Sequence, residues 1–147
     1  MASIQHSILY WFDENKRDLP WRKSKNPYSV WISEIILQQT RVEQGKPYYD
    51  RFMNRFPSVF DLANANEEDV LLAWKGLGYY TRARNIHKCA KTIVSEYGGN
   101  FPQERKALLN LPGIGEYTAA AIASICWDQP FIALDGNIIR IVSRLLD

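Results

Sequence analysis

The stretch from Leu111 to Asn137, LPGIGEYTAAAIASICWDQPFIALDGN, decides the fold. Gly113 and Gly115 predict a tight hairpin, because glycine lets the backbone turn sharply and lets a partner approach it closely. The hairpin opens a helix of small residues, and the free N–H groups at a helix N-terminus favour a phosphate. Asp135 follows about twenty residues after the second glycine. A phosphate-binding hairpin with a carboxylate held beyond it indicates chemistry on nucleic acid.

Outward from this stretch, apolar residues recur with helical spacing, and no segment of convincing length alternates as a strand would. Pro, Gly, Ser and Asn residues separate the helical segments and mark their ends. The sequence therefore predicts an all-α fold. The expected helices are Gln5–Lys16, Ser29–Thr40 with Ser29 as its N-cap, Pro47–Phe56 opened by Pro47, two short helices from Ser58 and Asn66, Tyr79–Tyr97, Gln103–Asn110, Glu116–Cys126, and a last helix capped by Asp135.

Length and composition predict one compact soluble domain. A chain of 147 residues can bury one sizeable core, and 46% hydrophobic with 23% charged residues excludes wholesale disorder. No apolar run approaches the roughly 20 residues of a membrane span, and the N-terminus lacks the small-residue cleavage site of a signal peptide. Cys89 and Cys126 are too few for a disulfide framework or a metal quartet, which favours a reducing cytoplasm.

A block of positive charge indicates where the protein meets a polyanion. The net charge of +2 is too small to identify a nucleic-acid partner, but five bases and no acid fall between residues 70 and 94. On a helix these bases would form a basic stripe along one face, as expected for contact with DNA. A solvated helix face would produce the same block. The five bases are Lys75, Arg82, Arg84, Lys88 and Lys91.

Glu34 lies in an apolar and aromatic segment, VWISEIILQQT, where a carboxyl is expected to hold its proton. On one helix, Glu34, Gln38 and Arg41 would fall on a single face, which also fits an ordinary solvated stripe. Asp135 has an ordinary interpretation as an N-cap, yet capping fixes its carboxylate and the helix dipole favours the ionised form. The two carboxylates are thus expected to occupy contrasting environments.

Two carboxylates in contrasting environments suit the cleavage of a glycosidic bond. One acts as an acid toward the leaving group, while the other stabilises or traps the sugar cation. A nucleoside poses the same problem, because departure of its base leaves an oxocarbenium-like sugar. We therefore expect Glu34 to protonate a leaving base and Asp135 to oppose the cation.

The chain resembles the helix-hairpin-helix DNA glycosylases over nearly its whole length, and within them the MutY-type adenine DNA glycosylases. The resemblance implies a helix-hairpin-helix glycosylase fold. It also implies removal of adenine mispaired with 8-oxoguanine or guanine in double-stranded DNA, after the base is flipped out of the helix. The matching blocks are LPWR (Leu19–Arg22), VWISEIILQQT (Val30–Thr40), GLGYYTRARN (Gly76–Asn85), LPGIGEYTAAAI (Leu111–Ile122) and LDGNIIRIVSRL (Leu134–Leu145).

The resemblance implies roles for individual residues. Glu34 corresponds to the glutamate that protonates adenine, and Asp135 to the aspartate that stabilises the sugar cation. Asn137 resembles an asparagine that supports this chemistry, and Tyr117 falls at a hairpin position that faces the catalytic pocket. The other implied contacts are Trp21 and Arg22 for the adenine pocket, Gln38, Gln39, Thr40 and Tyr79 for the duplex around the lesion, and Gly113 and Gly115 for a phosphate.

Two bound groups are also implied by the resemblance. Related hairpins bind a monovalent cation that bridges to a DNA phosphate, and the expected ligands are the main-chain carbonyls of Leu109, Leu111 and Ile114. Members of the family carry a [4Fe–4S] cluster on four cysteines after the DGN block, followed by a C-terminal lesion-recognition domain. Neither Cys89 nor Cys126 matches a cluster ligand, and the chain ends inside an apolar periodic pattern. We therefore expect a truncated piece of a longer protein.

The resemblance further divides the chain between two helical modules. Residues 22–133 are expected to form a six-helix barrel module, and residues 1–21 and 134–147 to belong to a second, cluster-side module. The intact protein is expected to be a monomer in the cytoplasm, associated with the nucleoid and not with a membrane.

Two alternatives remain open. An endonuclease III-like glycosylase/lyase would carry a Schiff-base lysine where this chain has Tyr117, and tends to carry DTH where this chain has Asp135-Gly136-Asn137. A non-catalytic helix-hairpin-helix module would need only the hairpin and the basic stripe. In that module Glu34 and Asp135 would be incidental.

Overall fold

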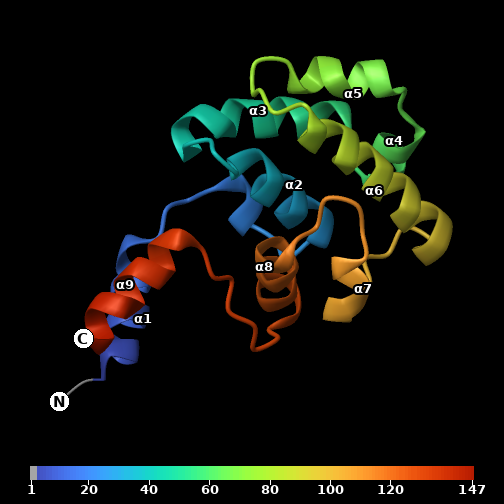
Figure 1. Ribbon diagram of the computed structural model, residues 1–147. Coiled ribbons are helices and arrows are strands. Elements are labelled where there is room, and N and C mark those ends of the chain that lie inside the picture. Colours follow the sequence, from blue (N-terminus) through green and yellow to red (C-terminus); the bar gives the residue numbers. More distant parts are fainter. Residues whose placement is uncertain (1–2) are drawn as a thin grey trace.

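A computed structural model describes residues 3–147, and within these residues it contains only helices (Figure 1). The all-α prediction is therefore confirmed. The elements are α1 (Ile4–Asn15), the 3-10 helix η1 (Pro20–Arg22), α2 (Pro27–Leu37), α3 (Val42–Arg55), α4 (Val59–Asn64), α5 (Glu67–Trp74), α6 (Thr81–Tyr97), α7 (Arg105–Leu109), α8 (Glu116–Trp127) and α9 (Gly136–Leu146).

Helix α2 forms the centre of the core, because eight of its eleven residues are buried. It packs against α3 and against α8, while α4 and α5 pack against α6. Four small residues of α8 are buried and let that helix lie close against α2: Ala119, Ala120, Ala121 and Ala123. Trp31, Phe52 and Trp74 are among the largest fully buried side chains. Glu34 thus stands on the most tightly packed helix of the molecule.

The structure corrects the start of α2. Asn26, not Ser29, is the N-cap, because its side-chain oxygen accepts from the backbone N–H groups of Tyr28 (2.9 Å) and Ser29 (3.4 Å). Ser29 is buried inside the helix, with its hydroxyl 2.6 Å from the Tyr49 hydroxyl. The residue predicted to cap the helix is therefore used for packing against α3.

The structure also corrects the end of α2, which lies at Leu37 and not at Thr40. Gln38 leaves the helical conformation with a ψ of 119°, and Gln39 has a left-handed φ of 59°. Arg41 belongs to the next element as the N-cap of α3. The predicted polar stripe along one helix face is therefore wrong.

Pro47 does not open a helix, as the sequence predicted, but is the sixth residue of α3. Its missing N–H removes a single helical bond, to the carbonyl of Glu43. Gly45 lets the first turn of α3 approach the end of α2, because a Cβ there would lie 2.9 Å from Leu37 Cδ2. Helix α3 therefore begins directly after a short loop of residues 38–41.

The predicted starts of α4 and α5 and the predicted N-cap of α9 are confirmed. Ser58 caps α4 in a reciprocal capping box with Asp61, and Asn66 precedes α5 as its N-cap. Asp135 caps α9 and accepts from the Ile138 N–H at 2.8 Å. Capping therefore fixes the Asp135 carboxylate at the start of the last helix.

Helices α1 and α9 lie at one end of the molecule, near the two termini, and have no buried residues (Figure 1). Within residues 3–147, no helix is both long enough and apolar enough to cross a membrane. The exposed large apolar side chains of these two helices are Ile4, Ile8, Leu9, Tyr10, Trp11 and Phe12 on α1, and Ile138, Ile139, Ile141, Val142, Leu145 and Leu146 on α9.

Candidate active site

A cleft of about 1170 Å³ opens where α1, η1, α2, α8 and the start of α9 meet. Its walls come from both ends of the sequence and from the middle. All four residues expected to take part in catalysis line this cleft, together with four of those expected to bind DNA or the base. These eight residues are Glu34, Tyr117, Asp135, Asn137, Trp21, Arg22, Gln38 and Gln39.

Glu34 projects into the cleft from the last turn of α2, between the buried residues Ser33 and Ile35. Burial raises the pKa of its carboxyl, and a hydrogen bond with the Tyr117 side chain lowers it by less. A carboxyl with a raised pKa keeps its proton nearer to neutral pH. This is the property that a general acid requires.

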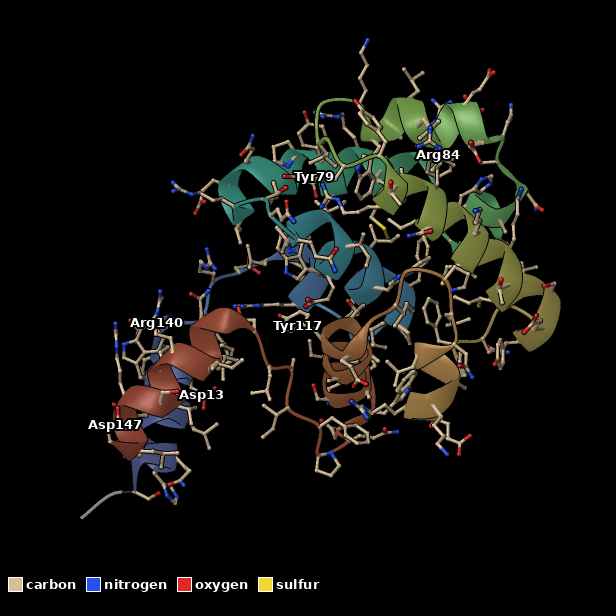
Figure 2. The ribbon with its side chains drawn as sticks, viewed as in Figure 1. Asp13, Tyr79, Arg84, Tyr117, Arg140 and Asp147 are labelled. Atoms are coloured by element: carbon tan, nitrogen blue, oxygen red, sulfur yellow. The ribbon has the colours of Figure 1, made fainter. Side chains whose placement is uncertain are left out.

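Tyr117 lies in the first turn of α8, at the end of that helix which faces α2 (Figure 2). Burial raises the pKa of its phenol, and the charges of Glu34 and Asp135 raise it further. The phenol is therefore neutral at physiological pH and can donate a hydrogen bond. Tyr117, Glu34 and Asp135 are therefore close enough for their charges to influence one another.

Asp135 stands at the edge of the cleft in a fixed position. One carboxylate oxygen accepts from the Ile138 N–H, and Asn137 Nδ2 lies 3.5 Å from the other oxygen. Arg140 Nη2 in turn donates to Asn137 Oδ1 at 3.0 Å. An anion held in this way can oppose positive charge that develops on a bound molecule.

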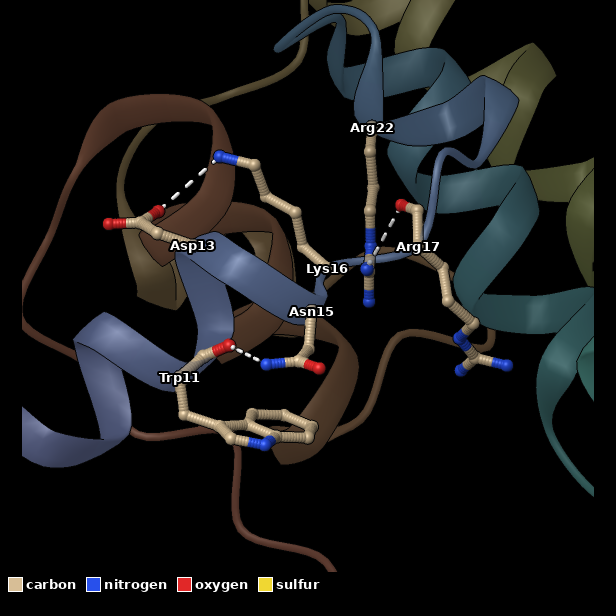
Figure 3. Close-up of polar contacts among 6 residues, drawn as sticks. All are labelled: Trp11, Asp13, Asn15, Lys16, Arg17 and Arg22. Carbon is tan, nitrogen blue, oxygen red and sulfur yellow. Dashed lines mark hydrogen bonds and ion pairs between the residues drawn. The ribbon is translucent and has the colours of Figure 1, made fainter.

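The 3-10 helix η1 supplies two further predicted residues. Trp21 is 8% exposed and its ring meets the Tyr49 ring edge-on at 5.0 Å, so it forms part of the cleft wall. Arg22 is exposed, lies over the Phe12 ring at 5.7 Å, and donates to the Arg17 carbonyl at 3.5 Å (Figure 3).

Lys16 and Arg17 also line the cleft, although the sequence did not indicate them. They come from a segment that none of the family-like blocks covers; the only signal was the number of bases around LPWR. Lys25 lies on the same wall, with its ammonium 2.9 Å from the Asp128 carboxylate. Lys16 and Arg17 are paired as well, with Asp13 at 3.3 Å and Glu43 at 3.7 Å, so the bases at this border alternate with acids.

Two exposed loop residues stand close to this region on separate loops. Gln39 lies in the loop after α2, next to Gln38, whose Nε2 donates to Thr118 Oγ1 at 3.4 Å. Tyr79 lies in the loop before α6 and is 67% exposed, with a left-handed φ of 48° (Figure 2). Tyr79 and Thr40 are outside the cleft lining. Exposed planar side chains of this kind are suited to enter a duplex.

The hairpin between α7 and α8 needs glycine for its turn at only one of the two predicted positions. Gly113 has a left-handed φ of 75°, and a Cβ there would lie 2.7 Å from Asn85 Cβ. Gly115 has an ordinary φ of −93°, and no atom lies within 4 Å of a Cβ placed there. The prediction that Gly115 makes the sharp turn is wrong. This glycine instead leaves open space in front of the α8 N-terminus.

The main-chain carbonyls expected to bind a cation include those of Leu111 and Ile114, which lie on either side of the turn at Gly113. The Leu111 carbonyl accepts from the Ile114 N–H at 3.2 Å, and the side chains of both residues are buried. Binding of a monovalent cation by the carbonyls of Leu109, Leu111 and Ile114 stays a prediction.

The predicted basic stripe is not one continuous surface. Arg82 is half-buried and its guanidinium donates to backbone carbonyls of two loops. Arg84 lies 3.7 Å from Glu67, and Lys75 belongs to the end of α5. The prediction of one continuous basic stripe is therefore wrong, and contact of the exposed bases with DNA stays a prediction. Sequence order alone does not show that α6 turns Arg82 inward.

The described part of the chain has no residues that fit a metal cluster. Among residues 3–147, no three His, Cys, Asp or Glu side chains gather in one place. Cys89 and Cys126 are buried, and burial raises the pKa of their thiols to about 12 and about 11. Thiols that stay protonated are poor iron ligands, so these two cysteines do not fit a [4Fe–4S] cluster.

The fold and the cleft define a base excision DNA repair protein of the helix-hairpin-helix class. The family described as HhH-GPD superfamily base excision DNA repair protein matches residues 32–146. The chain belongs to this superfamily. The resemblance expected from the sequence is thereby confirmed.

Within the superfamily, the sequence is similar to adenine DNA glycosylases. The adenine DNA glycosylase of Rattus norvegicus is 44% identical over 99% of this chain and 30% of that protein. The curated adenine DNA glycosylases that the chain matches are 40–47% identical to it, and the chain spans 26–47% of their length.

Solved structures show the same fold. A thermostable thymine-DNA glycosylase superposes with a TM-score of 0.86 at 31% identity, covering 93% of this chain and 64% of that one. A non-covalent endonuclease III–DNA complex gives a TM-score of 0.78 at 25% identity, covering 99% of this chain and 70% of that one.

Proposed function

We propose that the protein is a DNA repair glycosylase that hydrolyses the N-glycosidic bond of adenine mispaired with 8-oxoguanine or guanine. The observation that carries this proposal is that Glu34, Tyr117 and Asp135 share one cleft in which the Glu34 pKa is raised. Similarity to adenine DNA glycosylases supports adenine as the leaving base. The likeness to an endonuclease III bound to DNA supports DNA as the substrate.

In the proposed reaction, Glu34 donates its proton to a ring nitrogen of the flipped adenine. The base then leaves as a neutral molecule with the electron pair of the bond to C1′. The deoxyribose is left as an oxocarbenium-like cation, which Asp135 stabilises or traps. Water finally adds at C1′ and returns its second proton to a carboxylate, which leaves an abasic site.

Binding of the duplex is proposed to use the exposed groups around the cleft. Gln39 and Tyr79 fill the gap left by the extruded base, with Gln38 and Thr40 beside them. Trp21 lines the adenine pocket together with Arg22. The hairpin at Gly113 and Gly115 holds a phosphate against the α8 N-terminus, assisted by a cation on the carbonyls of Leu109, Leu111 and Ile114.

The organisation of the intact protein is also a proposal. Residues 22–133 form the barrel module, while residues 1–21 and 134–147 belong to a second module; the absence of buried residues on α1 and α9 supports this division. A [4Fe–4S] cluster would be held outside the described chain, and no step above passes through it. We propose that the protein works as a monomer on chromosomal DNA in the cytoplasm.

The decisive test replaces the proposed acid. In the full-length protein, Glu34→Gln should slow adenine release from an A:8-oxoguanine duplex by roughly 10²- to 10⁴-fold, because an amide cannot donate the proton. Affinity for the same duplex should change little. Single-turnover release and fluorescence anisotropy measure the two quantities.

Two further variants complete this test. Asp135→Asn should also slow release strongly, since it removes the charge that opposes the cation. Glu96→Gln, at an exposed position of α6, is the matched control and should leave both quantities unchanged. Near-normal release by Glu34→Gln would overturn the proposed function.

A further inference from the structure

We propose that Arg82 is a positioning residue that locks two DNA-probing loops together and thereby sets where Gln39 and Tyr79 enter the duplex. The first loop, residues 38–41, joins α2 to α3, and the second, residues 75–80, joins α5 to α6. The inference rests on the proposed function. It assigns Arg82 a task away from the DNA backbone, although its charge suggested a phosphate contact.

The guanidinium of Arg82 makes hydrogen bonds to both loops with its two terminal nitrogens. Nη1 donates to the carbonyls of Ile35 at 2.9 Å and Gln38 at 2.6 Å, at the end of α2. Nη2 donates to the carbonyls of Leu77 at 3.4 Å and Gly78 at 3.3 Å, in the second loop. One planar group therefore bridges two segments that lie far apart in sequence.

These carbonyls need such a partner. The last four carbonyls of a helix receive no hydrogen bond from an N–H group of the same helix. Helix α2 ends at Leu37, three residues before the predicted end at Thr40. Ile35 lies in that last turn, so the bond from Arg82 takes the place of a local C-cap. The short length of α2, and hence the position of Gln39, depends on a side chain from α6.

Aromatic packing holds the guanidinium in its plane. It lies 5.2 Å from the centre of the Trp74 ring and 5.7 Å from that of the Tyr79 ring. Trp74 is fully buried, and its own Nε1 donates to the Gly78 carbonyl at 3.1 Å. A lysine offers neither the planar stacking surface nor the paired donors, so it cannot make the same bridge.

The bonded carbonyls stand directly next to the probing side chains. Gln38 precedes Gln39 and Gly78 precedes Tyr79, and both probing residues have a left-handed φ, of 59° and 48°. Arg82 thus fixes the backbone on which each probe stands. Two loops ordered before binding lose less conformational freedom when they meet DNA, which favours correct placement of both probes.

The first measurement concerns the free protein. Hydrogen exchange of the full-length protein should show that Arg82→Met raises exchange in both loops together. Arg144→Met is the matched control, since Arg144 is exposed in the last turn of α9, an element that borders neither loop. It should leave the loops unchanged. Unchanged protection of both loops in Arg82→Met would overturn the inference.

The second measurement concerns the duplex. A 2-aminopurine placed next to the A:8-oxoguanine pair reports unstacking around the lesion by its fluorescence. Arg82→Met should reduce the fluorescence rise and slow single-turnover adenine release by roughly 10- to 100-fold. Arg82→Lys keeps the charge and should still show both defects, which also covers the case in which Arg82→Met fails to fold.

A double-mutant cycle separates positioning from general stability. If Arg82 acts through its loops, adding Arg82→Met to a protein that already carries Gln39→Ala and Tyr79→Ala should slow release little further. Independent, multiplying losses would overturn the inference. Wild-type protein that releases no adenine would overturn the proposed function, whereas active wild type with an equally active Arg82→Met variant would overturn this inference alone.

Discussion

At the scale of single residues, the half-buried carboxyl of Glu34 ties the proposed catalysis to stability. Its pKa is raised by burial, so the folded protein binds this proton more tightly than the unfolded chain does. The resulting stabilisation is present below the unfolded pKa and is lost as the pH rises through the folded pKa. Above that pH the fold carries a desolvated charge.

We therefore expect Glu34→Gln, which keeps the shape and removes the charge, to melt at a higher temperature than wild type at pH 8. The difference should shrink as the pH falls through the raised pKa of Glu34, because the wild-type carboxyl then takes up its proton and loses its charge. Thermal unfolding followed by circular dichroism across this pH range measures the effect. A difference that does not vary with pH would show that desolvation of Glu34 is not its source.

We propose that Tyr117 determines the class of reaction. A neutral phenol beside Glu34 and Asp135 cannot form an imine with the opened sugar, so adenine release should leave the DNA strand intact until heat or base cleaves it. Tyr117→Lys should gain strand cleavage and a covalent complex that borohydride traps. Tyr117→Phe is the control and should gain neither. Strand nicking by wild type that keeps pace with base release would place the protein with the glycosylase/lyases.

At the scale of elements, the two glycines of the hairpin have different tasks. Gly113 allows the turn, whereas Gly115 leaves open space in front of the α8 N-terminus. Gly113→Ala should lower the free energy of unfolding by roughly 1–3 kcal/mol, because its left-handed φ and the contact with Asn85 both oppose a Cβ. Gly115→Ala should leave stability nearly unchanged, since its φ suits any residue and its Cβ would meet no atom. Thermal melts compare the two variants.

The Gly115→Ala variant also tests phosphate binding. Gly115→Ala should weaken binding to lesion and undamaged duplexes alike, because phosphate contacts position the protein without reading the sequence. Anisotropy titrations with both duplexes measure this. A loss confined to the lesion duplex would assign the hairpin to lesion recognition instead.

Helix boundaries show where sequence reasoning succeeds and where it stops. The capping of α9 by Asp135 was predictable, because the signal lies within a few residues. The end of α2 at Leu37 was not, since it depends on Arg82, more than forty residues further along the chain. The start of α2 was assigned to Ser29 as N-cap, whereas Asn26 caps the helix and the Ser29 hydroxyl packs against Tyr49 of α3.

The candidate site was predictable to a similar extent. Glu34 and Asp135 stand out because family-like blocks surround them, and the structure brings both to one cleft. Arg82 was assigned to a surface stripe, because nothing in the sequence distinguishes a guanidinium that bonds backbone carbonyls from one that faces solvent. Lys16 and Arg17 were missed because only the tertiary fold places the end of α1 at the cleft.

At the scale of the whole molecule, burial is divided unevenly between the helices. The residues of α2 and α8 are mostly buried, whereas α1 and α9 have no buried residue. In the chain of 147 residues, we expect backbone amides of α1 and α9 to exchange roughly 100-fold or more faster than those of α2 and α8. Hydrogen exchange read by mass spectrometry resolves the four helices. Equal protection would mean that contacts other than burial hold α1 and α9.

The left-handed backbone at Gln39 and Tyr79 has a consequence for any attempt to raise the thermal stability of this protein. Each residue holds its backbone in a conformation that disfavours a side chain, at a cost of order 1–2 kcal/mol. Glycine or asparagine at either position would relax that backbone and raise heat resistance. Directed evolution under thermal selection alone would therefore discard the two side chains proposed to probe DNA. A library screened for heat resistance must also be screened for adenine release. At Gln39 and Tyr79, substitutions that raise thermal stability are expected to lower activity.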